Sequence, residues 1–268
     1  MTLLSSFHAR AGTIVLALAL IGGIGCAGLS ASDKAAYQQR LRDQETERQR
    51  RIAALEPAAA AGDPAARSAL ASALLAAHDP AQNDVPRALA LLEQAVAQDD
   101  GLAQALLGEI LVGSMPNVRT DRQTPPGRQD AERGIALLQR AATKACTYPW
   151  PQRFYTGIQP ALGIRLALGD AGRADESLLW RARGILHCGI EHAAALSSYV
   201  KFARTSSTKR IEAAALLALT GDAAATAEAS ATLPAADAAA AERLAADLRR
   251  RVADSERDYP APPRKEQP

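Results

Sequence analysis

Apolar residues recur at helical spacing along most of the chain, and one apolar pattern is used twice. Residues 87–96 read RALALLEQAV, and residues 133–142 read RGIALLQRAA. The segment before each copy also repeats, with small and apolar positions at the same spacing: Ala66, Leu70 and Leu74, then Ala103, Leu107 and Leu111. A helical unit that recurs in this way is typical of stacked helical repeats rather than of a single enzymatic core.

Turn and capping residues divide the rest of the chain into further helices. Asp63 and Asp84 stand where N-caps are expected, and Pro64 suits the first position of the helix that follows Asp63. Valine and isoleucine are few and scattered, so strands are poorly supported. We therefore predict an all-α protein, a short α-solenoid of stacked antiparallel helix pairs. Helices are predicted at 64–77, 85–98, 102–112, 130–144, 160–168, 174–186, 191–203, 209–219 and 235–254, with a weaker alanine-rich segment from Gly221.

The same patterns divide the chain into five segments. The second of them is highly charged and lacks a continuous apolar stripe, which is typical of a solvated helix. Glu56-Pro57 and the run AAAAGDP that follows it are expected to end this helix. The last is rich in proline and is predicted to be disordered. The segments are a signal peptide or membrane anchor (1–25), a charged helical tether (26–61), a helical repeat domain (62–233), a C-terminal helix (234–257) and a tail (258–268).

The N-terminus predicts where the protein resides. No charged residue occurs between Ala11 and Ser32, and residues 13–21 form an apolar run that small residues follow. A short basic start, an apolar run and small residues are the parts of a secretory signal. Residues 23–26 resemble a bacterial lipobox, which implies lipidation at Cys26. An uncleaved membrane anchor and cleavage after Ala27 with release of the protein are the alternatives.

If Cys26 is acylated, its acyl chains would anchor the protein in a membrane. The residue after it is alanine rather than aspartate, and by resemblance to enterobacterial lipoproteins this implies sorting to the outer membrane. All three readings of the N-terminus place the body of the protein outside the cytoplasm. The expected location is therefore the periplasmic face of a bacterial membrane, with attachment to the membrane through the N-terminus.

Composition narrows the class of function. Hydrophobic residues make up 48% of the 268 residues but aromatic residues only 4%, because much of the apolar content is alanine, the best helix former. A net charge of +2 is too small to indicate a nucleic-acid partner. The sequence contains neither a G-x-S-x-G elbow nor a phosphate-binding glycine loop. We expect no enzymatic activity and no cofactor.

Two cysteines besides Cys26 are candidates for a disulfide. Cys146 and Cys188 each follow the end of a similar helix, so stacking of those helices would bring them together. An oxidising compartment favours their pairing. Two buried free thiols are the alternative.

Residues 85–113 resemble a Sel1-type variant of the tetratricopeptide repeat. Ala88, Leu91-Leu92 and Ala95 match on the first helix, and Ala103, Leu107-Gly108, Leu111 and Gly113 match on the second. The weaker resemblance extends over about 62–186. It implies a scaffold that binds peptides, proteins or polymers without chemistry of its own. Lipoproteins with such repeats occur in envelope assembly and exopolysaccharide export, so the resemblance implies an envelope protein or a polymer-export component as partner.

Candidate contact residues follow from the concave surface that stacked helix pairs create. Polar residues of the first helix in each pair are candidates for partner binding, namely Arg67, Gln104, Glu109 and Arg165. An ordinary solvated face is the alternative for each of them.

Two other kinds of site are weighed against this one. Trp150 lies in an aromatic connection that could bind a glycan or peptide, or could serve packing alone. His187, Glu191 and His192 include residue types that bind zinc, which suggests a metal-dependent hydrolase as the last alternative. Their spacing matches neither H-E-x-x-H nor H-x-x-E-H, so no metal site is predicted.

Overall fold

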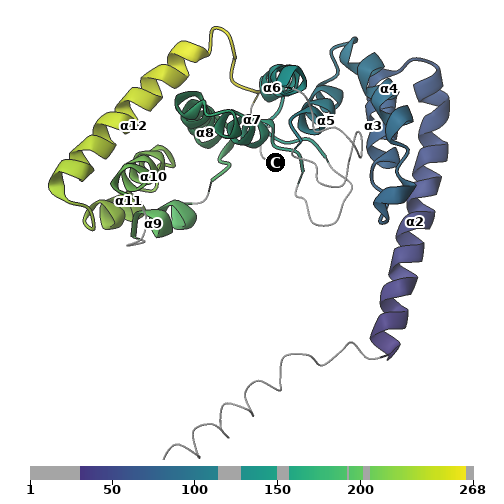
Figure 1. Ribbon diagram of the computed structural model, residues 1–268, viewed down its shortest axis with the longest axis horizontal. Coiled ribbons are helices and arrows are strands. Elements are labelled where there is room, and N and C mark those ends of the chain that lie inside the picture. The colour runs from purple at the N-terminus through teal and green to yellow at the C-terminus, as the bar shows by residue number, and fades with distance from the viewer. Residues whose placement is uncertain (1–30, 114–127, 150–156, 192, 202–205, 264–268) are drawn as a thin grey trace, which may run out of the picture. The chain divides into compact units, whose positions relative to one another are not determined.

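The computed structural model describes residues 31–113, 128–149, 157–191, 193–201 and 206–263 (Figure 1). In this part of the chain the secondary structure is helical, apart from one isolated antiparallel bridge between Tyr148 and Ile158. The all-α prediction is confirmed. The helices are α2 (Ala31–Ala60), α3 (Pro64–Leu74), the 3-10 helix η1 (Pro80–Gln82), α4 (Val85–Val96), α5 (Gly101–Leu111), α6 (Arg128–Ala142), α7 (Pro160–Asp170), α8 (Ala174–Cys188), α9 (Ala193–Lys201), α10 (Ser207–Leu219), α11 (Ala223–Ser230) and α12 (Ala235–Ser255).

The chain divides into two units, residues 1–47 and 48–268. The described part of the first unit is the start of α2, which is charged and largely exposed. Among the residues that the structure describes, no helix is long and apolar enough to cross a membrane. The predicted anchor and Cys26 lie outside the described residues.

Helix α2 ends within residues 56–64, the part of the chain where the sequence predicts its end. It passes through Pro57 and ends at Ala60. A proline inside a helix removes one backbone hydrogen bond. The helix continues because alanines follow the proline and because Ile52 and Ala59, on either side of it, are buried in the apolar core.

Aspartate side chains cap four helices. In each case the carboxylate accepts a hydrogen bond from a backbone N–H of the first turn, which otherwise has no intrahelical partner. The N-caps predicted at Asp63 and Asp84 are confirmed. The pairs are Asp63 with Ala65 N (2.8 Å), Asp84 with Arg87 N (3.2 Å), Asp100 with Ala103 N (2.8 Å) and Asp222 with Ala225 N (2.9 Å).

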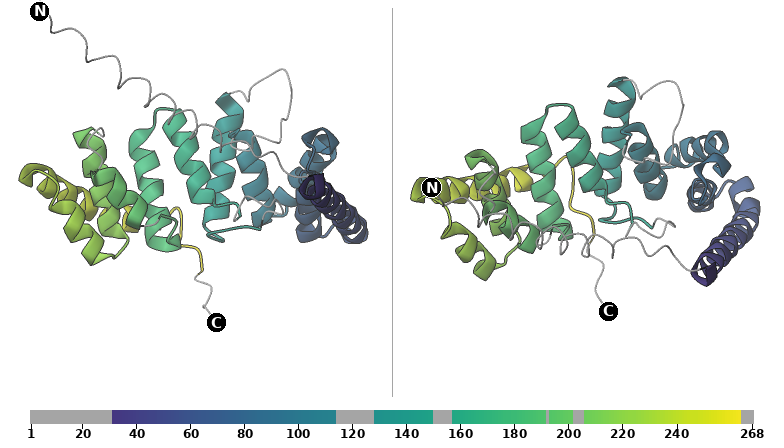
Figure 2. Two further views of the ribbon diagram at one scale, coloured as in Figure 1. Left: turned by 90° about the horizontal axis from the view of Figure 1, so that it is seen from below. Right: turned by 60° about the horizontal axis from the view of Figure 1, so that its bottom comes forward.

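From α3 to α8, each helix packs against the next helix in the chain, and Figure 2 shows these neighbours side by side. Contacts also join α3 to α5 and α5 to α7. The order changes after α8, where α10 contacts α8, α9, α11 and α12, and α12 also contacts α8.

The apolar core consists of three clusters that share helices. On α6, Leu137 and Ala141 belong to the first cluster, whereas Leu138 belongs to the cluster formed with α7 and α8. On α8, Trp180 belongs to that cluster and Ala182 to the third, which contains α10 and α12. Each shared helix therefore buries two faces against different neighbours.

Glycines allow the closest of these approaches, between α5 and α6. A Cβ atom at Gly108 would lie 2.7 Å from Cγ of Leu138, and one at Gly134 would lie 2.9 Å from Cβ of Leu111. Neither position has room for a side chain.

The segment after α12 folds back onto α8. Tyr259 packs edge-on against Trp180, with ring centroids 5.2 Å apart, and Pro262 is buried. The side chain of Arg183 is buried between them: its Cζ lies 5.0 Å from the Trp180 ring centroid, and it donates hydrogen bonds to Ser255 Oγ and to the Tyr259 carbonyl. The tail predicted to be disordered over 258–268 is thus docked as far as Pro262, because its aromatic and proline side chains cover the apolar cluster.

Arg183→Met should detach this segment. The variant loses two hydrogen bonds from a charged donor and the cation–π contact, so the free energy of unfolding should fall by about 2–3 kcal/mol. Amide exchange of residues 256–262 should also accelerate. Arg249→Met is the matched control, because Arg249 is an exposed arginine that also bonds a carbonyl, that of Ala218. Equal stability of the two variants would contradict the role assigned to Arg183.

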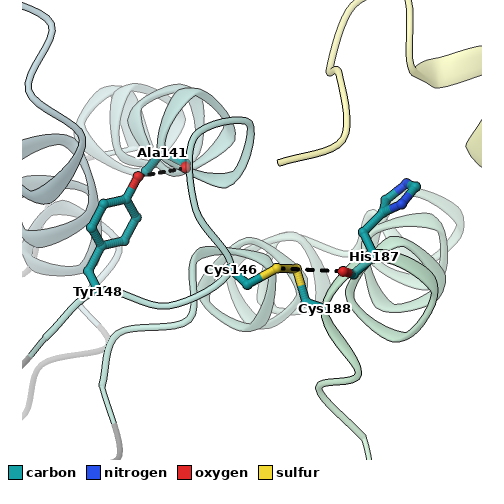
Figure 3. The surroundings of a disulfide bond; sticks show 5 residues. All are labelled: Ala141, Cys146, Tyr148, His187 and Cys188. Atoms are coloured by element: carbon teal, nitrogen blue, oxygen red, sulfur yellow. Dashed lines mark hydrogen bonds between the residues drawn. A yellow bond between two sulfur atoms is a disulfide. The ribbon is translucent and has the colours of Figure 1, made fainter. Parts of the chain in front are cut away.

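A disulfide joins the end of α8 to the connection that follows α6 (Figure 3). Cys146 and Cys188 are 42 residues apart in sequence, and their Cα atoms lie 5.4 Å apart. The pairing agrees with the prediction from the sequence. Next to it, Tyr148 donates a hydrogen bond of 2.9 Å to the Ala141 carbonyl, and the bridge to Ile158 closes the connection between α6 and α7.

Replacing both Cys146 and Cys188 by alanine should lower the free energy of unfolding by about 4 kcal/mol, the loop-closure value for a bridge of this span. Chemical denaturation of the full chain under oxidising conditions measures this loss. Wild-type protein in a thiol reductant should match the double variant. If the oxidised wild type is no more stable than the double variant, the disulfide does not contribute as expected.

Candidate functional site

Two arginines and one glutamate from three elements meet at one point of the surface. Arg165 of α7 donates from Nη1 to Oε1 of Glu191 at 2.7 Å. Arg181 of α8 donates from Nε to the same oxygen at 2.6 Å and from Nη2 to Oε2 at 2.8 Å. The exposed fractions of the three side chains are 25% for Arg165, 23% for Arg181 and 16% for Glu191, so the group is partly shielded from water.

The end of α8 positions Glu191. Gly189 adopts the left-handed conformation (φ 60°), which glycine tolerates without steric cost, and its N–H bonds to the carbonyl of Ile185. The N–H of Ile190 bonds to the carbonyl of Gly184, and the Ile190 side chain packs on the cluster of α6 to α8. The next residue, Glu191, is thereby held beside the two arginines.

The charges of this group do not balance. Two guanidinium groups face a single carboxylate, which leaves one positive charge in excess, and arginine stays protonated in proteins. Burial lowers the pKa of Arg165, Glu191 raises it, and Arg181 lowers it further. The Nε atom of Arg165 is buried and has no hydrogen-bond acceptor among the described residues. A half-shielded excess charge with a free donor is costly unless something anionic binds it.

The spaces around these residues are small. One of about 10 Å³ is lined by Arg165, Arg181 and Glu191 together with Ala161, Leu162, Trp180, Gly184 and Ile190. A second of the same size lies beside the disulfide and Pro262. Each holds about one water molecule, whereas small-molecule sites enclose hundreds of Å³. Neither space suits a substrate or an organic cofactor.

The structure places the four predicted contact residues in different surroundings. Gln104 was predicted to be exposed, but it is fully buried. Its Nε2 donates a hydrogen bond of 2.7 Å to Asp99 Oδ1. Arg67 is half-buried and its Nε bonds to the Ala59 carbonyl at 3.1 Å. Arg165 is the one that joins a charged cluster. The remaining candidate, Trp150, lies outside the described residues.

Glu109, the other predicted contact residue, faces α7 instead of open solvent. A Cβ atom at Gly163 would overlap with its Oε1, so the carboxyl occupies the space that the glycine leaves. Burial raises the pKa of Glu109 to about 7. The carboxyl is therefore proton-sensitive near neutral pH.

The hydrogen bonds of Glu191 also concern the alternative of a metal site at His187, Glu191 and His192. Both of its carboxylate oxygens accept hydrogen bonds from guanidinium groups. Within the described ranges no group of three histidine, cysteine or acidic side chains is arranged to hold a metal ion. His192 lies outside those ranges. The sequence analysis did not identify Arg181 and treated Glu191 only as a possible metal ligand. The reason is that the spacing of residues 165, 181 and 191 does not indicate that they meet.

Comparison of the chain with protein-family models, with curated proteins and with solved structures finds no match.

Glu109→Gln should change how stability depends on pH. The folded-state pKa of Glu109, about 7, lies above its unfolded value of 4.5, so the folded state binds the extra proton. This contribution is fully present below about pH 4.5 and is lost as pH rises through 7. Between pH 5 and pH 8 the variant should lose about 2–3 kcal/mol less stability than the wild type. Urea titrations at both pH values measure this.

Glu242→Gln is the control for that experiment, because Glu242 is an exposed glutamate on α12. It should retain the wild-type pH profile. A Glu109→Gln profile that coincides with wild type would show that Glu109 is not protonated in the folded state near neutral pH.

Proposed function

We propose that the protein is a helical-repeat scaffold of the Sel1/tetratricopeptide type that binds other proteins and performs no chemistry of its own. The observation that carries the proposal is the order of packing: α3 to α8 each contact the next helix, and the first helices of successive pairs contact one another, α3 with α5 and α5 with α7. Stacked antiparallel pairs produce this order, and a helix hairpin that cannot bury its own apolar face requires it.

The core supports the same proposal. Leu137 and Leu138 are adjacent on α6, yet they belong to different apolar clusters. Neighbour-by-neighbour burial of this kind leaves the polar faces of the helices available for a partner. The small spaces beside α7 and α8 suit surface recognition better than turnover of a small molecule.

We further propose that the scaffold works at the periplasmic face of a bacterial membrane, most simply the outer membrane, attached through an acylated Cys26. The support is the lipobox-like sequence at 23–26 and the pair Cys146–Cys188, which is placed for a disulfide and suits an oxidising compartment. The charged helix α2 would then serve as the tether between the anchor and the repeats. The partner would be an envelope-assembly protein or a component of polymer export.

Site-specific photo-crosslinking in the native host tests the scaffold. A photoreactive amino acid at Arg67 on α3 or at Leu166 on α7, where the leucine is 48% exposed, should give a discrete adduct with one envelope protein. The same amino acid at Glu242, on the exposed side of α12, is the control and should give none. Absence of adducts at both test positions, or the same adducts at all three positions, would overturn the proposal.

A further inference from the structure

The cluster of Arg165, Arg181 and Glu191 has binding capacity that its internal bonds do not use. On Arg181, the Nε–Nη2 edge grips the Glu191 carboxylate with two hydrogen bonds. On Arg165, Glu191 occupies only Nη1, and the Nε of the equivalent edge has no acceptor among the described residues. One oxygen of a second carboxylate could therefore accept a hydrogen bond from Arg165 Nε.

The net charge of the cluster and the space beside it both agree with the binding of a second carboxylate. One positive charge in the cluster is unbalanced, and the carboxylate of Glu191 is its only acidic member. The adjoining space of about 10 Å³ accommodates about one oxygen atom and is lined by all three side chains. Partial burial strengthens an ion pair beyond its value in open water.

Arg173 provides a contrast with Arg165 in the number of carboxylates that it bonds. Arg173, at the start of α8, bonds two carboxylates, with Nη1 at 3.0 Å from Glu132 and Nη2 at 2.6 Å from Glu176. Its side chain is 34% exposed. Arg173 is therefore surrounded by sufficient negative charge, whereas Arg165 shares a single carboxylate with a second arginine.

The residues around the cluster indicate the kind of ligand. Leu166, the residue after Arg165 on α7, is 48% exposed. Tyr199 of α9, which raises the pKa of Arg165 by its charge, is 58% exposed. Large apolar side chains beside a fork-shaped donor suit a polypeptide that carries an acidic residue flanked by apolar ones. An anionic polysaccharide would instead call for a row of aromatic faces and several cationic groups.

We propose that Arg165 and Arg181, held together by Glu191, form a receptor for one glutamate or aspartate side chain of the partner polypeptide, and that Leu166 and Tyr199 contact the apolar residues beside it. The proposal rests on the scaffold function above and names the chemistry of its partner. Arg165 supplies the Nε donor, Arg181 fixes Glu191, and Glu191 orients both guanidinium groups.

NMR of the full chain tests this with two peptides that differ in one group, acetyl-Leu-Glu-Leu-amide and acetyl-Leu-Gln-Leu-amide. The Nε–H signal of Arg165 should shift saturably with the glutamate peptide and not with the glutamine peptide. Arg165→Gln should weaken binding of the glutamate peptide at least tenfold. Arg165→Lys, which keeps the charge but loses the fork, should weaken it nearly as much, and Arg173→Gln should leave it unchanged.

Several results would overturn the proposal. Equal shifts with both peptides, no shift of the Arg165 signal, or equal loss in Arg173→Gln would each remove the site. Saturation by inorganic phosphate as strong as by the glutamate peptide would reduce it to an unselective anion site. Tighter binding of trigalacturonate than of the glutamate peptide would assign the site to a polysaccharide instead of a polypeptide.

The outcomes also separate this site from the scaffold function. A cross-linked partner without peptide binding leaves the scaffold in place and removes the site. Peptide binding without a cross-linked partner leaves the site in place and removes the scaffold function.

Discussion

The burial of each helix against the helices next to it is the constraint on which the rest of the structure depends. Alanine and leucine supply most of the apolar core in the described part of the chain, and single helices of this length are marginal in water without such packing. Glycines at 108 and 134 bring α5 and α6 close enough for Leu138 to fill the seam between them. The positions of Arg165, Arg181 and Glu191 follow from the packing of α7 on α8.

After α8, contacts other than helix-by-helix packing stabilise the chain. The segment after α12 returns to α8, where Arg183 bonds the carbonyl of Tyr259 and stacks on Trp180. The disulfide at Cys188 ties the C-terminal end of α8 to the connection after α6. Both devices hold α8, the helix that carries Arg181 and leads into Glu191. The candidate site is thus built on a helix that a disulfide and a buried arginine both tie to other segments.

Local sequence signals predicted most of the helices but little of the site. Capping aspartates, prolines and glycines mark helix ends through bonds within a few residues, so α4 and α5 were predicted nearly as they are. Pro57 alone does not end α2, because burial of Ile52 and Ala59 outweighs the lost hydrogen bond. The docking of Tyr259 and the meeting of Arg165 with Glu191 depend on contacts between residues far apart in sequence, which spacing and composition do not encode. Gln104 was predicted exposed because a polar residue usually is; its bond to Asp99 allows its burial.

Hydrogen exchange after one core substitution tests neighbour-by-neighbour stacking most directly. Leu70 is buried in α3, and Leu70→Ala should cost about 2–5 kcal/mol. If each helix depends mainly on its neighbours, native-state amide exchange should accelerate in α3, α4 and α5 and stay unchanged in α10 and α12. Equal acceleration throughout the chain would show a single cooperative core and contradict the account.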